Sequence, residues 1–377
     1  MRSVRRVLVV QPYGIGDLLF VTPVLRALCL HPTVEKVDMV LGSRTDSVIR
    51  HNPHVDETFV IDKDVFHARK TSSNLQELWQ LGLKLRKQQY DLLLDYSLRG
   101  EYAFFSQFFL GIPRRAGFAY KDRGFFHNLR VPLHGGYQGR HVVEYFCDLA
   151  EKAGIPVEDR FLEFYLGPKD RTAAREVLHK KVAKNCQNYL VVSPGGGESW
   201  GRDAYLKRWP VSFFAALSKR LADDLNMDGV VIVGSSGEKE LGESFVREWN
   251  QRVPVINLMG EMSLGHTAAL IGQAAIFIGN DGGLVHVAHA LRTPLIAFYG
   301  PVDHRVYGPY PESFDAIAVY QEALDCRPCY RNFRYRSDCP KCECLQALLP
   351  EDVYGILQRR KFMQKLQTVL PLERKSS

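Results

Sequence analysis

The stretch I-G-N-D-G-G-L-V-H at residues 278–286 decides how the second half of this chain is organised. An apolar run at 274–278 predicts a buried strand, and residues 284–291 and 293–299 predict a short helix and the next strand. The two glycines allow a tight turn and let a ligand approach the main chain. A helix that begins at such a turn directs unpaired N–H groups at one point, where a phosphate binds well. The alternative is an ordinary glycine-containing turn in an α/β domain.

The same alternation of strands and helices continues through the rest of the chain. Strands are predicted at 7–10, 37–41, 58–61 and 91–95, and again at 189–192, 229–234 and 255–258. Continuous apolar strands between helices are typical of a parallel sheet covered on both faces. A length of 377 residues favours two such domains. We expect an α/β protein with two Rossmann-like doubly wound domains facing each other across a cleft, at 1–165 and 166–345, followed by a C-terminal helical segment at 346–377.

The chain is basic, with a formal net charge of +7, and 46% of its residues are hydrophobic. This charge favours acidic partners such as nucleotide sugars, phosphorylated lipids, an anionic membrane surface or nucleic acid; the alternative is a mildly basic enzyme that makes no use of it. No apolar run approaches the roughly 18 residues of a membrane span. Arginines before the apolar run at 7–10 imitate a signal peptide, but the run is too short. We therefore expect the protein in the cytoplasm.

A carboxylate follows the first predicted strand. Ligands of parallel sheets bind outside the carboxyl ends of the strands, and Asp17 lies in the loop at that end, after Gly14 and Gly16. Asp17 could act as a general base on a hydroxyl, or it could simply cap the next helix. The glycines leave room for a substrate. They do not form a dinucleotide-binding Gly-x-Gly-x-x-Gly fingerprint, because position 19 is Leu.

The second half contains two further loops at strand ends. Residues 193–197, Ser-Pro-Gly-Gly-Gly, form a glycine-rich loop that can cradle a phosphate, although no Walker A motif is present. Lys207 is a cation close to this loop in sequence, or else a solvated surface lysine. Glu238 follows the next strand, where it could accept hydrogen bonds from a ribose. The alternative for Glu238 is a first-turn helix residue that interacts with the helix dipole.

A basic and aromatic region lies in the first half. From Lys84 to Arg140 there are ten Lys and Arg residues against four Asp and Glu residues. The interleaved aromatics are Tyr102, Phe104, Phe105, Phe108, Phe109, Phe118, Tyr120, Phe125 and Phe126. Such a surface suits a phosphorylated lipid or an anionic membrane face, and also single-stranded nucleic acid. The alternative is that the aromatics belong to the core and the charges to a solvated face.

Three blocks of sequence, taken in order, carry a family likeness. They are residues 14–17 with 22–28, residues 193–197 with 207–210, and residues 280–286 with 293–294 and 299–301. With these blocks the chain resembles glycosyltransferase family 9, the ADP-heptose:lipopolysaccharide heptosyltransferases. The likeness covers about residues 5–360. No block is decisive alone, but the ordered set is specific.

The resemblance implies a GT-B fold, with the acceptor bound by the first domain and the nucleotide-sugar donor by the second, and a C-terminal helix that can cross back to the first domain. It implies inverting transfer without a catalytic metal or other cofactor, with Asp17 as the general base. The donor-binding residues it implies are Ser193, Gly195, Gly196, Lys207, Glu238, Met262, Asp281, Gly282, Gly283, Leu284 and His286. The candidate acceptor-binding residues are Gly14, Gly16, Arg114, Arg115, Arg140 and His141.

Two departures from the family pattern concern the sugar. Gly282 stands where Thr or Ser is more frequent, and Val285 replaces a frequent small polar residue. ADP-heptose is the first choice of donor, and another nucleotide sugar is the alternative. The expected acceptor is a lipopolysaccharide core or related glycan at the cytoplasmic face of the inner membrane. We also expect peripheral contact with that membrane and no binding of nucleic acid. Two rival readings are a GT-B sugar-nucleotide epimerase and a non-catalytic nucleotide- or nucleic-acid-binding module with a zinc knuckle.

Five of the eight cysteines lie close together near the C-terminus. Cys326-x2-Cys329-x9-Cys339-x2-Cys342 contains two Cys-x2-Cys pairs, with Cys344 beyond them. Four thiolates at such spacing can bind Zn²⁺ tetrahedrally. We expect a structural zinc ion at the four paired cysteines; free thiols, a disulfide and an iron–sulfur site are the alternatives.

Overall fold

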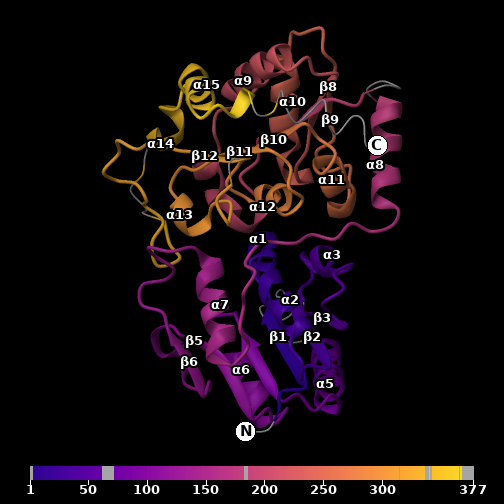
Figure 1. Cartoon of the computed structure of the whole chain (residues 1–377), viewed down its shortest axis with the longest axis vertical. Helices are drawn as coiled ribbons and strands as arrows, with labels where there is room; N and C mark the ends of the chain where they lie inside the picture. Colours follow the sequence, from indigo (N-terminus) through magenta and orange to yellow (C-terminus); the bar gives the residue numbers. More distant parts are fainter. Residues whose placement is uncertain are drawn as a thin grey trace. The chain divides into compact units, whose positions relative to one another are not determined.

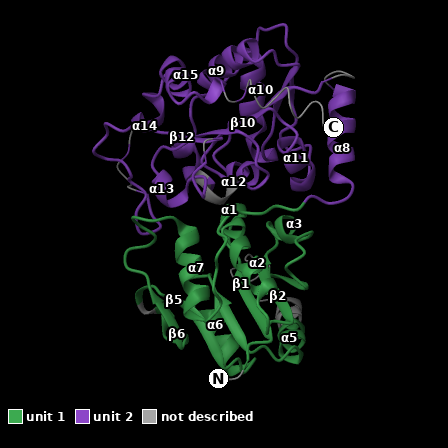
Figure 2. Cartoon of the chain, viewed as in Figure 1, with its two compact units in different colours: residues 1–165 green, residues 166–377 purple. Residues whose placement is uncertain are grey.

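The structure is a computed structural model that describes residues 3–61, 72–181, 186–313, 315–335, 339, 342–364 and 366. The chain divides into two compact units, Met1–Tyr165 and Leu166–Ser377 (Figure 2). Each unit is built on a parallel sheet of six described strands, with helices connecting them (Figure 1). This confirms the predicted α/β class with two Rossmann-like units.

In unit 1 the strands are β1 (Arg6–Gln11), β2 (Lys36–Gly42), β3 (Glu57–Ile61), β4 (Leu92–Asp95), β5 (Arg114–Ala119) and β6 (Leu129–Pro132). The helices are α1 (Ile15–Leu19), α2 (Thr22–Leu30), α3 (Asp46–Ile49), α5 (Ser72–Lys87), α6 (Gly100–Phe108) and α7 (Val142–Lys152), with a 3₁₀ turn η1 (Lys121–Gly124). The strand order is β3-β2-β1-β4-β5-β6. The chain therefore leaves β1 toward one side of the sheet and β4 toward the other, which makes the gap between β1 and β4 the switch point where such sheets bind ligands.

The amphipathic pattern over residues 18–30 predicts a single helix after the first strand, but the structure has two helices there. α1 ends at Leu19, and α2 begins at Thr22 with Pro23 in its first turn. Proline has no N–H to donate and favours the first turn of a new helix over the interior of a continuing one. The Thr22 hydroxyl donates a hydrogen bond to the Leu19 carbonyl at 2.7 Å. As a result Asp17 lies inside α1 and not in the loop before it.

In unit 2 the strands are β7 (Tyr189–Ser193), β8 (Gly229–Ile232), β9 (Val255–Asn257), β10 (Ile276–Asn280), β11 (Leu295–Phe298) and β12 (Ala316–Val319). The helices are α8 (Asp170–Lys181), α9 (Val211–Asp224), α10 (Lys239–Glu248), α11 (Leu264–Ile271), α12 (Gly283–Ala290), α13 (His304–Tyr307), α14 (Glu343–Gln346) and α15 (Pro350–Arg359), with 3₁₀ segments η2 (Glu198–Lys207) and η3 (Ser236–Glu238). The order is β12-β11-β10-β7-β8-β9, so the switch point of this unit lies between β7 and β10.

The C-terminal helix α15 packs within unit 2. Its Tyr354 hydroxyl donates to the Asp224 carboxylate at 2.5 Å, and the Arg220 guanidinium lies 3.8 Å from the Tyr354 ring centroid. Val353 and Leu357 are fully buried in the same apolar cluster as Leu217 of α9, so the described part of the predicted 346–377 segment is part of the second core. Residues 367–377, where a helix could cross back to the first domain, lie outside the described residues. Among the described helices, none has the length and apolar character to cross a membrane.

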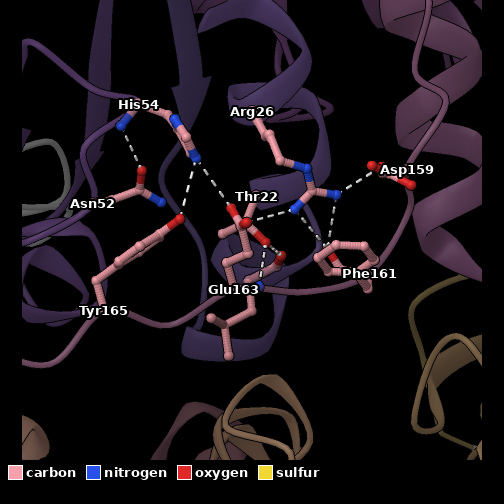
Figure 3. A network of polar contacts seen from close by, with 9 residues as sticks. Thr22, Arg26, Asn52, His54, Asp159, Phe161, Glu163 and Tyr165 are labelled. Carbon is pink, nitrogen blue, oxygen red and sulfur yellow. Dashed lines mark hydrogen bonds and ion pairs between the residues drawn. The ribbon is translucent and has the colours of Figure 1, made fainter. Parts of the chain in front are cut away.

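The last segment of unit 1 is fastened to α2 by Arg26 (Figure 3). The Arg26 guanidinium donates to the carbonyl of Asp159 at 2.9 Å, lies 4.1 Å from the Phe161 ring centroid and pairs with the Glu163 carboxylate at 2.7 Å. The Glu163 N–H donates to the Thr22 hydroxyl at 3.0 Å. Arg26 is only 8% exposed, so the arginine of the 22–28 block has a structural partner for its charge in unit 1.

The same network continues to the final residue of unit 1. The His54 imidazole lies 3.4 Å from the second Glu163 oxygen and 3.2 Å from the Tyr165 hydroxyl (Figure 3). The Asn52 carboxamide oxygen accepts a hydrogen bond from the main-chain N–H of His54 at 2.9 Å. These contacts fix the last segment of unit 1 in place as far as Tyr165, the final residue before unit 2.

Candidate active-site residues

In unit 2 the predicted donor-side loops meet at the switch point. β7 and β10 are neighbours, and Ser193 pairs with Gly279 in their register. The glycine-rich loop leaves the carboxyl end of β7, and the turn that starts α12 leaves the carboxyl end of β10. The structure therefore brings together two of the three sequence blocks at the edge where parallel sheets bind ligands.

Asn280 joins the segments at this edge. Its side-chain oxygen accepts the Trp209 N–H at 2.9 Å, and its side-chain nitrogen donates to the carbonyls of Pro194 and Gly195 at 2.8 and 3.2 Å. Asn280 is 3% exposed. One buried carboxamide thus fixes the end of β10, the glycine-rich loop and the segment after η2. The sequence predicted Asn280 only as a strand end and helix cap, because its contacts are distant in sequence.

Lys207 and Asp281 form a buried ion pair. The Lys207 ammonium lies 2.7 Å from an Asp281 oxygen, with side-chain exposures of 4% and 6%. Trp209 holds the Lys207 segment in place, since its ring stacks on Phe298 with centroids 4.0 Å apart and its indole N–H donates to the Leu348 carbonyl at 2.8 Å. The structure therefore excludes the reading of Lys207 as a solvated surface lysine.

The Glu238 carboxylate lies against the glycine-rich loop. One oxygen accepts the N–H groups of Gly196 and Gly197 at 2.8 and 3.2 Å and lies 3.2 Å from the Arg208 guanidinium. The other oxygen accepts the Ser235 hydroxyl at 3.0 Å. Glu238 is 7% exposed. The loop N–H groups that we expected to bind a phosphate thus donate hydrogen bonds to a carboxylate instead. In this structure Glu238 therefore stabilises the loop.

Steric contacts explain two glycines of this loop. A Cβ at Gly195 would lie 2.3 Å from a Glu238 oxygen, and one at Gly196 would lie 2.2 Å from the Ala204 carbonyl oxygen. Real Cβ atoms do not approach so closely, so these positions need glycine for packing. Ser193, which ends β7 before the loop, is buried. The loop is therefore a tightly packed element at the strand end.

The α12 turn contains the other predicted diphosphate-binding residues. Gly282 has an extended backbone, and a Cβ there would lie 3.6 Å from the Asn280 carbonyl oxygen, so a serine or threonine would fit. Gly283 and Leu284 begin α12 and are half-buried, and His286 is buried one turn into the helix. Met262 is half-buried in the loop between β9 and α11, which follows the carboxyl end of an outer strand of the same sheet. The α12 terminus lies at this edge, where the amides of a helix N-terminus can meet an anion.

In unit 1 Asp17 lies at the switch point after β1. It is the third residue of α1, it is half-buried, and its carboxylate accepts the Gly14 N–H at 3.1 Å. Gly16 lies in the same first turn. Asp17 thus closes the first turn of α1 and also presents a partly exposed carboxylate at the carboxyl edge of the sheet. Both alternatives from the sequence, a helix-end residue and a base at the ligand edge, describe its position.

A second carboxylate, missed by the sequence reasoning, ends β4 at the same switch point. Asp95 pairs with the His127 imidazole at 3.1 Å, with side-chain exposures of 1% and 3%. Its other oxygen accepts the Ser97 N–H at 2.9 Å, and the Tyr13 hydroxyl donates to the Ser97 carbonyl. Burial raises the pKa of Tyr13 despite the nearby Arg99, and the charges of Asp95 and Asp17 raise it further. An aspartate at the end of a buried apolar strand was the signal available in the sequence.

The predicted acceptor residues fall into two groups. His141 caps α7, accepting the Val143 N–H at 3.1 Å, and packs edge-on against Phe20 with ring centroids 5.1 Å apart, next to the end of α1. Arg140, one residue earlier, pairs with Asp148. These two residues precede a helix that starts after the carboxyl end of β6.

Arg114 and Arg115 lie at the opposite edge. They are the first residues of β5, so they occupy the amino end of a strand that runs parallel to β4. Arg114 donates to the Ala153 carbonyl at 2.5 Å, and Arg115 donates to the Ile112 and Phe126 carbonyls at 2.6 and 2.9 Å. Their guanidinium groups bind main-chain oxygens of unit 1 and do not share the edge that carries Asp17. Arg114 and Arg115 thus lie apart from Arg140 and His141, and a role for them in acceptor binding stays a prediction.

The cysteine region does not form the predicted four-thiol site. Among the described residues, no group of three His, Cys, Asp or Glu side chains is arranged to hold a metal ion. Cys326 is exposed. Burial raises the pKa of Cys342, and the neighbouring thiols of Cys339 and Cys329 raise it further. Burial, together with the thiols of Cys329, Cys342 and Cys339, raises the pKa of Cys344 to about 12. The thiols that raise one another's pKa are thus Cys329, Cys339, Cys342 and Cys344.

Known proteins can now be compared with this geometry. The sequence model of glycosyltransferase family 9 (heptosyltransferase) matches residues 78–334, which is more than half of the chain. The chain belongs to glycosyltransferase family 9. Family 9 membership makes it a glycosyltransferase, and the matched region contains the donor-side edge of unit 2. Asp17 precedes the matched region.

Curated and solved relatives of this family 9 chain agree with the assignment. Lipopolysaccharide heptosyltransferase 3 of Escherichia coli is 26% identical over 353 residues, covering 90% of this chain and 98% of that protein. Lipopolysaccharide heptosyltransferase 2 of E. coli K12 is 29% identical over 311 residues, covering 78% and 83%. The structure of E. coli ADP-heptose lps heptosyltransferase II has a TM-score of 0.71 at 22% identity, covering 96% of this chain and 99% of that chain. This last similarity identifies the fold as GT-B.

Proposed function

We propose that this family 9 enzyme is an inverting heptosyltransferase that moves a sugar, ADP-heptose being the first choice of donor, to a hydroxyl of a lipopolysaccharide core or related glycan. The names of the heptosyltransferase relatives support this donor and acceptor class. The observation that carries the proposal is the buried Lys207–Asp281 pair beside the start of α12, at the switch point of unit 2. A cation and a helix terminus there suit the diphosphate of a nucleotide sugar.

The reaction follows from the groups at the two switch points. Asp17 takes the proton of the acceptor hydroxyl while that oxygen attacks the anomeric carbon of the donor sugar. The bond from the anomeric carbon to the diphosphate oxygen breaks, and the leaving nucleoside diphosphate keeps the electron pair. Lys207 and the first amides of α12 stabilise the negative charge that grows there. Because these groups supply the positive charge, we propose a reaction without a catalytic metal. Attack opposite the leaving group inverts the anomeric centre.

Asp281 and Glu238 position other parts of the proposed donor site. Asp281 fixes the Lys207 ammonium at 2.7 Å and, as the residue before the α12 turn, lies where the transferred sugar would contact it. Glu238 braces the glycine-rich loop through the amides of Gly196 and Gly197. We propose that a bound ribose hydroxyl shares the Glu238 carboxylate with these amides, and that the base of the nucleotide lies near Met262.

The Asp17→Asn variant tests the proposed base. Transfer from ADP-heptose to a lipid A–core acceptor should fall by about two to four orders of magnitude, the contribution typical of general bases. Binding of ADP-heptose, measured by calorimetry, should be unchanged. The control is Asp46→Asn, which alters another first-turn aspartate of unit 1 that pairs with Arg50. Undiminished transfer by the Asp17 variant would remove this residue from the reaction.

The donor is tested separately. A calorimetric screen of ADP-, UDP- and GDP-sugars should give the tightest binding for ADP-heptose, and the Lys207→Met variant should lose most of that affinity. Preference for a UDP- or GDP-sugar would keep the reaction class and replace the proposed donor. We propose action at the cytoplasmic face of the inner membrane, where the acceptor class implied by the relatives' names is made.

A structural zinc ion at Cys326, Cys329, Cys339 and Cys342 is a separate proposal that rests on the spacing of these four cysteines. The thiols would have to approach one another more closely than the described residues do. Metal analysis of the purified protein decides the question. The expected result is about one zinc per chain, lost in a Cys329→Ser/Cys342→Ser variant. Metal-free protein of normal stability would overturn it.

A further inference from the structure

We propose that one face of unit 1, formed by α5, α6 and the residues after η1, docks onto a bilayer that contains anionic phospholipid. Six large apolar side chains are exposed on this face and define the aromatic patch: Trp79, Leu83, Phe104, Phe105, Phe108 and Phe125. Phe108 and Phe125 are 62% and 73% exposed, and Trp79 is 58% exposed. Clusters of exposed large apolar residues mark interaction sites, whereas single ones need no explanation.

The members of the aromatic patch are connected by ring contacts. On α6, Phe104 and Phe108 have ring centroids 4.8 Å apart, and both contact Phe126, at 5.2 and 5.9 Å. Phe126 in turn packs edge-on against Phe125 at 5.3 Å. Half of the patch is therefore one continuous group of rings from α6 to the segment after η1.

A second group of rings joins α6 to α5 through Phe109. Phe105 stacks on Phe109 with centroids 4.8 Å apart, and Trp79 of α5 packs against the same ring at 5.3 Å. At Gly82 of α5 a Cβ would lie 2.9 Å from both Phe105 and Phe109, so the absence of a side chain lets the two helices approach. The rings of the aromatic patch thus form two groups, one that joins α6 to the segment after η1 and one that joins α6 to α5.

The patch is not a part of the core left uncovered by chance. α5 already buries Leu85 against β4 and β1 residues such as Leu93 and Leu8, and Ala103 of α6 is fully buried. Trp79 and Leu83 are spaced four residues apart on α5, as are Phe104 and Phe108 on α6, so each pair lies on one face of its helix. Each helix thus has one apolar face toward the core and a second one toward solvent.

Positive charges flank the aromatic patch on both sides. Lys84, Arg86 and Lys87 are exposed in the last turns of α5, and Arg86 lies 5.6 Å from the Phe109 ring centroid. On the other side, Lys121, Arg123 and Arg130 are exposed around η1 and β6. Basic residues contribute about 1 kcal/mol each near an anionic leaflet, and aromatic side chains insert at the headgroup level.

This charge decides between occupants of the surface. A second copy of the chain would bring the same positive flanks against each other, which repel. An apolar protein partner would leave the cations without a counter-charge. An anionic bilayer satisfies both features, because headgroups meet the cations and the interface receives the rings. The proposal goes beyond the proposed function, since it depends on neither the donor nor the transferred sugar.

The test is binding of the full chain to vesicles, measured by co-sedimentation. Vesicles of phosphatidylethanolamine with phosphatidylglycerol should bind the protein, and pure phosphatidylcholine vesicles should bind it at least about tenfold more weakly. A Phe104→Ser/Phe108→Ser/Phe125→Ser variant should lose at least about tenfold in affinity for the anionic vesicles. A Lys84→Glu/Lys87→Glu variant should lose a similar amount and most of the salt dependence.

Two comparisons keep the test decisive. Leu30→Ser removes an apolar side chain that is 73% exposed elsewhere in unit 1, so it should bind like the wild type. Trp79 should shift its emission to the blue on anionic vesicles, and the shift should be absent in Trp79→Phe. Unchanged binding of the triple variant, with its fold verified by circular dichroism, would overturn the proposal. Self-association through the patch would also overturn the proposal. The same holds if the protein binds single-stranded nucleic acid more tightly than anionic vesicles and the same substitutions abolish that binding.

Discussion

Replacing Asn280 with alanine removes a side chain that joins three segments of the donor-side edge. The variant loses three hydrogen bonds, to the Trp209 N–H and to the Pro194 and Gly195 carbonyls. The Trp209 N–H is then left buried without this acceptor, at a cost of about 1–3 kcal/mol, and each lost bond to a carbonyl costs about 1 kcal/mol. We expect the free energy of unfolding of unit 2 to fall by about 3–5 kcal/mol.

The same substitution should weaken donor binding more than its effect on stability explains. Without Asn280 the glycine-rich loop is no longer fixed to the end of β10, so ordering it is added to the cost of binding. We expect the dissociation constant for ADP-heptose to rise at least about tenfold at a temperature where the variant is folded. Calorimetry gives the affinity, and denaturant unfolding followed by tryptophan fluorescence gives the stability.

Asn188→Ala is the matched control. Asn188 is also buried, and its side-chain nitrogen donates to the carbonyls of Leu225 and Asn226 at 3.1 Å, but it lies at the amino end of β7. It should lose stability with unchanged donor affinity. Asn280→Asp should be no better than the alanine variant, because it keeps the acceptor for Trp209 but turns a carboxylate oxygen toward two carbonyls. Equal donor affinity in the Asn280 and Asn188 variants would refute the positioning role.

Three further predictions concern unit 2. Lys207→Met and Asp281→Leu should each destabilise the protein by about 3–5 kcal/mol, since each leaves a buried charge unpaired, and the double variant should lose less than the sum; additive losses in denaturant unfolding would contradict the pairing. Gly282→Thr should leave the melting temperature nearly unchanged, because glycine and threonine differ by only a few tenths of a kcal/mol as helix N-caps, whereas a steric clash would lower it. Burial, with a neighbouring arginine, lowers the pKa of His289 and of His304 from 6.5 to about 4; their neutral forms stabilise the fold fully above pH 6.5, so stability should decline as the pH falls from 6.5 to 4, less steeply in a His289→Gln/His304→Gln variant.

Much of the architecture could be predicted because apolar periodicity is a local signal. The strands that form the centre of both sheets, β1 and β10, are buried along almost their whole length, and their sequences are continuously apolar. β12 was not predicted: its alternately buried residues 316–319 lie at the sheet edge and form a short, mixed pattern. The split between α1 and α2 was also missed, since a proline inside an amphipathic pattern fits either a kinked helix or a new one.

The functional edge could be predicted only where chemistry follows a strand directly. Asp17, the glycine-rich loop and the α12 turn each follow a predicted strand, so topology brings them to an edge that ligands favour. The Asp95–His127 pair could not be predicted, because its partners lie 32 residues apart and meet only through sheet register. The position of Arg114 and Arg115 at the amino end of β5 could not be predicted either, because charge counts do not record which end of a strand a residue occupies.

The Arg26 network determines where this chain can be divided for separate expression. A fragment that stops before Asp159 would keep the guanidinium of Arg26 at the surface of α2 while removing the carbonyls and the carboxylate that surround it. A fragment that runs to Tyr165 keeps all of these partners, together with the His54 contact of its last residue. Unit 1 prepared in the longer form offers a way to measure the proposed acceptor and membrane binding in the absence of unit 2.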